Sequence, residues 1–170
     1  GGSITPSGEV SVNHGEDQAF TIAADPGHHV AEVLVDSASV GAVSSYTFTN
    51  VQADHSIEAR FAVDSHTVTA TAGAGGSITP SGEVSVNHGE DQAFTIAADP
   101  GHHVAEVLVD SASVGAVSSY TFTNVQADHS IEARFAVDSH TVTASAGAGG
   151  SITPSGEVAV NHGEDQAFTI

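Results

Sequence analysis

The sequence predicts an all-β chain, built as a tandem array of small sandwich-like or β-grasp-like repeats of 74 residues that form a rod. Three observations carry this prediction. The segment GGSITPSGEV begins at Gly1, again at Gly75 and again at Gly149, so the period is 74 residues. Apolar and polar residues alternate in short segments, as they do in half-buried strands. No segment keeps the helical spacing of apolar residues over three turns.

The copies are nearly identical. Residues 1–74 differ from residues 75–148 only at Thr71, where the later copy has Ser145. A catalytic site needs one residue in one environment, whereas an array needs the same environment many times. Identical units present identical faces, so they can stack through the same junction each time. The repetition therefore favours a structural role over a catalytic one.

Within one repeat, the alternation predicts six or seven short strands separated by turns. The expected strands are 66–72, a short one around Ile78, 83–87, 92–98, 103–110, 120–125 and 131–135. The step of three from Val104 to Val107 breaks the alternation and predicts a β-bulge. The small residues of 111–119 predict a loop, and the segment 99–101, Asp-Pro-Gly, predicts a turn.

The seam between repeats is expected near Asp64-Ser65 and Asp138-Ser139, where one strand runs directly into the next. This seam divides the chain into a repeat without its first strand (1–65), a complete repeat (66–139) and the first half of a third (140–170). We expect the chain to be a window onto a longer head-to-tail array. The alternative is a fibre in which copies of the chain exchange strands, so the expected partner in either case is the protein itself.

Composition excludes several classes of function. Asp and Glu total 21 against two arginines and no lysine, which gives a formal charge of -19. Such a chain cannot neutralise a phosphate backbone, so nucleic-acid binding is excluded. Without cysteine there is no disulfide framework and no thiolate metal site. No apolar run approaches 18 residues, so we expect no membrane insertion in this segment.

The order of short motifs along the repeat resembles a known family. The markers are Gly75-Gly76-Ser77-Ile78, Gly89-Glu90, Val107-Leu108-Val109-Asp110, Tyr120-Thr121-Phe122 and the segment from Ile131 to Phe135. Together they are similar to the divergent InlB B-repeat domain. The resemblance implies a small β-rich module without catalytic residues that acts as a stalk, spacer or adhesive. It also implies a place outside the cell or at the cell surface, because these modules occur in tandem in secreted and surface proteins. The chain departs from the family at His66, His88 and His102, where such repeats often have tyrosine.

Histidine and aspartate are the residues that carry chemistry. Imidazole suits Zn, Cu and Ni, and carboxylates suit Ca²⁺, so one interpretation of these residues is a metal site, for either Ca²⁺ or a divalent transition metal. The candidate ligands are His14, His28, His29, His66, Asp64, His88, His102, His103, His140 and Asp138. The interpretation we favour is that these histidines replace tyrosine at strand ends and that the carboxylates form a solvated surface. A third interpretation is that the histidines sense pH.

Catalytic arrangements are poor, and we expect no enzyme. Contiguous letters such as Asp64-Ser65-His66 cannot converge on one point as a catalytic triad requires. The sequence therefore predicts a structural repeat module of an extracellular fibre or of a cell-surface stalk or adhesin. The alternative is an extracellular repeat that binds metal ions or a glycan.

Overall fold

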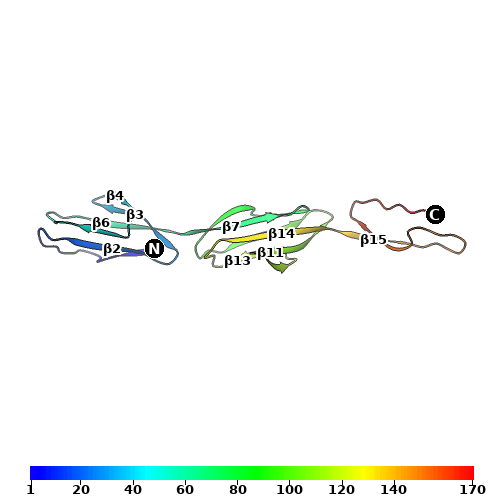
Figure 1. Ribbon diagram of the computed structural model, residues 1–170, viewed down its shortest axis with the longest axis horizontal. Helices are drawn as coiled ribbons and strands as arrows, with labels where there is room; N and C mark the ends of the chain where they lie inside the picture. Colours follow the sequence, from blue (N-terminus) through cyan, green and yellow to red (C-terminus); the bar gives the residue numbers. More distant parts are fainter. The chain divides into compact units, whose positions relative to one another are not determined.

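The protein consists of strands and loops throughout. A computed structural model describes residues 1–170 and contains sixteen strands and no helix (Figure 1). This confirms the predicted all-β class. The chain forms two compact units. The first comprises residues 1–66, 86–90 and 124–127, and the second comprises 67–85, 91–123 and 128–170. None of the elements is a helix that is long and apolar enough to cross a bilayer.

The middle copy of the repeat holds eight strands in two sheets. They are β7 (Ser65–Ala72), β8 (Gly76–Thr79), β9 (Gly82–Asn87), β10 (Gln92–Ala98), β11 (His102–Val109), β12 (Ala112–Gly115), β13 (Ser119–Phe122) and β14 (His129–Val137). One sheet has the order β13-β10-β8 and the other has the order β12-β11-β14-β7-β9. The absence of any helix distinguishes this sandwich-like arrangement from the β-grasp alternative.

The core lies between these two sheets. Phe94 and Phe122 come from the smaller sheet, and their rings meet edge to face at 5.9 Å between centroids. From the larger sheet, Val107 and Ile131 are fully shielded from solvent. Burial of each such side chain contributes roughly 1.5–3 kcal/mol, so this apolar layer is the main stabilising feature of the repeat.

The first and last strands of this copy lie side by side. Strand β7 pairs with β14 in parallel, from His129 opposite Val68 to Ala133 opposite Ala72. Val68 and Ala70 enter the core from β7, where their exposed fractions are 0% and 2%. Thr69, between them, and Thr71 face outward, as the alternation predicted.

The strand count and one loop were predicted wrongly. The copy has eight strands rather than six or seven, because residues 112–115 form β12 instead of part of a loop. Asp110 and Ser111 both have positive φ, 48° and 67°, and make the two-residue turn that returns the chain onto β11. The expected bulge is confirmed, since the register of β11 against β14 shifts between Val104 and Glu106.

The preceding copy has the same sequence and a shorter list of strands. These are β1 (Gly2–Thr5), β2 (Gln18–Ala24), β3 (His28–Val35), β4 (Ala38–Gly41), β5 (Ser45–Phe48) and β6 (Ile57–Val63). They form two sheets, β1-β2-β5 and β4-β3-β6. Residues 8–13 form no strand here, although their counterparts build β9. Residues 8–12 and 51–57 instead line a groove of about 880 Å³, together with Phe20 and Phe48.

The last copy contributes one hairpin. Strand β15 (Ser139–Ala144) pairs antiparallel with β16 (Gly156–Asn161), with Val142 opposite Val158. Val142 remains 40% exposed, in contrast to the buried Val68 at the same place in the repeat.

Candidate functional site

Asp64 lies at the centre of a polar cluster that we call the seam cluster: Gly27, His29, Asp64, His66 and His88. The backbone N–H of Asp64 donates to the carbonyl of Gly27 at 2.8 Å, and the carbonyl of Asp64 accepts from the N–H of His88 at 2.8 Å. The Asp64 carboxylate lies 2.7 Å from Nδ1 of His29. All five residues belong to the first compact unit.

Gly27 is required at its position by the His88 ring. A Cβ on Gly27 would lie 2.2 Å from Cδ2 of His88, which is closer than any real contact, and Gly27 also has a φ of +75°. The imidazole is therefore seated directly on the glycine backbone. This contact fixes the His88 ring in place before any ligand is considered.

The seam cluster places two imidazoles together. Nε2 of His66 lies 3.0 Å from Nδ1 of His88, and the rings are 5.3 Å apart with an angle of 50° between their planes. His66 is the second residue of β7 and His88 follows the end of β9, which is the neighbouring strand of the sheet. Both side chains are half-buried.

The same cluster is built a second time, 74 residues later, within the second unit. The backbone of Asp138 bonds to Gly101 at 2.8 Å and to His162 at 2.7 Å, and its carboxylate lies 2.8 Å from His103. His140 and His162 approach to 3.3 Å and are more exposed than the first pair. The equivalent cluster is Gly101, His103, Asp138, His140 and His162.

The ten predicted ligands are thus divided among separate roles. His28 and His102 lie apart from the pairs, with Nδ1 at 3.3 and 3.4 Å from the carbonyls of Pro26 and Pro100. His14 corresponds to His88 in the repeat but is exposed and contacts no second imidazole. No group of three or more His, Cys, Asp or Glu side chains is arranged to hold a metal ion. The metal site stays a prediction, carried now by the two histidine pairs.

A second cluster was not predicted. The Asp36 carboxylate lies 2.7 Å from Nδ1 of His55 and accepts from the N–H of Ser56 at 2.8 Å, and the imidazole stacks on Phe48 at 5.0 Å. The Ser56 N–H and then His55 lower the pKa of the Asp36 carboxyl below its usual value. No sequence signal joins Asp36 to His55, because 19 residues separate them.

The counterpart Asp110 also has a lowered pKa, but burial opposes the shift more strongly there. Burial raises its pKa, but hydrogen bonds from Ser130 and His129 outweigh that effect, so the pKa is lowered overall. In both copies the serine and the histidine bond to the carboxylate rather than to each other. The cluster therefore stabilises a turn and lacks the nucleophile-to-base contact of a hydrolase.

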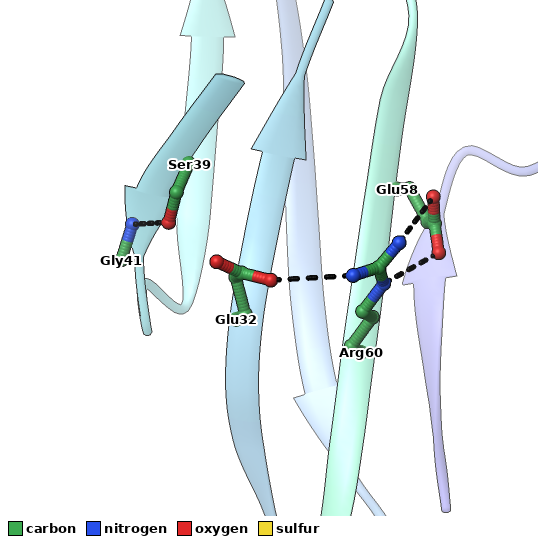
Figure 2. Close-up of polar contacts among 5 residues, drawn as sticks. All are labelled: Glu32, Ser39, Gly41, Glu58 and Arg60. Atoms are coloured by element: carbon green, nitrogen blue, oxygen red, sulfur yellow. Dashed lines mark hydrogen bonds and ion pairs between the residues drawn. The ribbon is translucent and has the colours of Figure 1, made fainter. Parts of the chain in front are cut away.

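The arginines are engaged on the surface of the sheets. Figure 2 shows Arg60 of β6 between Glu58, at 2.8 Å, and Glu32 of β3, at 3.4 Å. The hydrogen bond from Arg60 to Glu58 raises the pKa of the guanidinium above its usual value. Both cations of the chain are held in this way, since Arg134 lies 2.7 Å from Glu132 and 3.6 Å from Glu106.

Comparison with known proteins gives one result. Residues 66–139 match the model of the divergent InlB B-repeat domain. No curated protein and no solved structure matches the chain. Domains of this family typically lie outside the cell or at its surface. Residues 66–139 therefore belong to the divergent InlB B-repeat family, and the remainder of the chain repeats their sequence almost letter for letter.

Proposed function

We propose that the protein is a non-catalytic structural module of an extracellular fibre or of a cell-surface stalk or adhesin. The observation that supports this role best is the parallel pairing of the first and last strands of the complete repeat. In a tandem array, tension enters a repeat at the start of β7 and leaves it at the end of β14. Because the two strands run in the same direction, this load is applied along them and shears all their hydrogen bonds together.

The family supports the same role, because it is a family of cell-surface repeat modules. The repetition supports it as well, since both seam clusters reproduce the same contacts within a few tenths of an ångström. A module that works by position rather than by chemistry needs this uniformity along the array.

Force spectroscopy tests the mechanical role. The chain has no cysteine, so a pair of introduced cysteines defines the direction of pulling. Ser65→Cys with Ser139→Cys loads β7 against β14 in shear. Asp99→Cys with Ser139→Cys loads the antiparallel strands β11 and β14 at their paired ends, His102 and Val137, so their bonds break one after another.

We expect the shear direction to resist several times more force than the unzipping direction. Equal forces in the two directions would contradict a load-bearing role for the repeat.

Self-assembly is the second part of the proposal. In the first copy, the groove lined by residues 8–12 and 51–57 corresponds to the place that β7 occupies in the complete copy. A segment with the sequence HTVTA fits that place, and it is supplied by the preceding repeat of an array or by β15 of another copy. Val142→Asp separates these cases, because Val142 is exposed in its own hairpin. We expect the substitution to prevent association between chains if strands are exchanged and to leave sedimentation unchanged if the array is continuous.

A further inference from the structure

The histidine pairs have the spacing of two ligands on one metal ion. Around an ion that binds imidazole nitrogens at about 2.0–2.1 Å, two ligands lie about 2.9 Å apart at a right angle and about 3.3 Å apart at the tetrahedral angle. The pairs measure 3.0 Å for His66 and His88 and 3.3 Å for His140 and His162. Both distances fall within that interval.

The first pair is also held in position by contacts that do not involve its ring nitrogens. The N–H of His88 is bonded to Asp64, and the ring rests on Gly27. His66 is fixed by its place at the start of β7. Because the two nitrogens already lie at ligand spacing, only the rings have to turn for both lone pairs to point at one ion.

Proton placement is compatible with binding. The 3.0 Å contact requires one imidazole to donate N–H and the other to accept with its lone pair. An ion binds beside the line that joins the two nitrogens, about 2.0–2.1 Å from each, and the donor ring moves its proton to its other nitrogen. Both rings stay neutral and both facing nitrogens become ligands, so no proton has to be released.

The donor set selects the kind of ion. Imidazole nitrogen favours Cu²⁺, Ni²⁺ and Zn²⁺, and Cu²⁺ binds most strongly in this series. Ca²⁺ needs six to eight oxygen ligands. The nearby Asp64 carboxylate is already bonded to His29, and the cluster offers no set of oxygen ligands. The formal charge of -19 attracts any cation but does not discriminate among them.

We propose that His66 with His88, and His140 with His162, each bind one divalent transition-metal ion, with water completing the coordination. This inference does not depend on the mechanical role and adds a binding function to it. The proposal replaces the ten candidate metal ligands named from the sequence with four histidines. It places one metal site at each seam between repeats.

Copper titration tests the assignment. Calorimetry and electron paramagnetic resonance with Cu²⁺ near neutral pH should give two tight sites with nitrogen ligands in the 170-residue chain. We expect His66→Gln to remove one site and His66→Gln with His140→Gln to remove both. Glutamine keeps a polar side chain at each place, and circular dichroism verifies that the sheets remain.

His14→Gln is the matched control, because His14 has the sequence context of His88 without a second imidazole beside it. It should leave both sites intact, and Ca²⁺ should not compete. Tight binding that survives the double substitution, or that His14→Gln reduces equally, would overturn the proposal, because single histidines would then account for the copper.

Discussion

Two copies of one sequence fold to different extents in the same chain. Residues 82–87 form β9 and bury Val86 to 4% exposure, whereas the identical residues 8–13 form no strand and leave Val12 half-buried. The last strand differs as well. It begins at His129 in the complete copy, whereas in the first copy it begins at Ile57, two residues after His55, the counterpart of His129. The residues of the two segments are identical, so the difference comes from the strands that lie beside them.

The strand β7 accounts for the contrast. It lies between β14 and β9 in the five-stranded sheet, where it pairs with one neighbour and supports the other. In the first copy, no strand occupies this place beside β6, and a groove lies there. The repeat therefore completes its core with the strand that follows the seam. Each repeat of an array therefore depends on the segment that joins it to the preceding one.

The largest expected difference between the copies is at one isoleucine of the last strand. Ile131 is 0% exposed, and its counterpart Ile57 is only half-buried. Ile131→Ala should cost about 2–5 kcal/mol of unfolding free energy, and Ile57→Ala less than half as much. Urea unfolding followed by tyrosine fluorescence measures the two costs separately. The chain has two tyrosines, so Tyr46→Phe leaves Tyr120 to report on the complete copy, and Tyr120→Phe leaves Tyr46 to report on the first copy. Equal costs would show that β7 does not complete the core.

A glycine contact should behave alike in both copies, because it does not involve β7. A Cβ on Gly76 would lie 2.6 Å from the carbonyl of Ala97 and 2.4 Å from the Phe135 ring, and Gly2 meets Ala23 and Phe61 at the same distances. We expect Gly76→Ala and Gly2→Ala each to destabilise their own copy by about 1–3 kcal/mol through overpacking. The same tyrosine reporters apply, and a tolerated substitution in either copy would contradict the shared contact.

Acid should weaken both copies through Asp36 and Asp110. Their folded-state pKa values are lowered, so their contribution to stability is complete above the unfolded value of about 3.9 and is lost as pH falls through the folded values. Asp36→Asn with Asp110→Asn should therefore destabilise the chain most near neutral pH. The thermal unfolding midpoints of variant and wild type should converge as the pH falls below about 4. A constant offset across that range would argue against these carboxylates as the source.

Much of the fold follows from the sequence because strand periodicity is local. The alternation of Val68 and Ala70 with threonine placed β7 correctly, and the step from Val104 to Val107 located the bulge. Strand β12 was missed because its turn uses Asp110 and Ser111, both with positive φ, instead of the usual Asn-Gly or Asp-Gly.

The polar clusters could be predicted less well, because they depend on contacts between distant parts of the chain. The sequence identified His66, His88 and Asp64 as candidate metal ligands. The contact between the two histidines, however, depends on the position of β7 beside β9. Local sequence patterns also could not predict that residues 8–13 form no strand, because these residues are identical to residues 82–87, which form β9.

Hydrogen exchange tests most directly whether β7 completes the repeat. Because residues 8–13 and 82–87 are identical in sequence, their NMR signals are told apart by labelling one copy at a time with ¹⁵N. The exchange rate of each amide hydrogen is then followed by NMR. Exchange in β9 should be slower than in residues 8–13 by on the order of 100-fold or more. Joining a further copy of residues 65–74 in front of Gly1 should bring residues 8–13 to the protection of β9. Equal protection in the two segments, or no response to the added strand, would contradict the account.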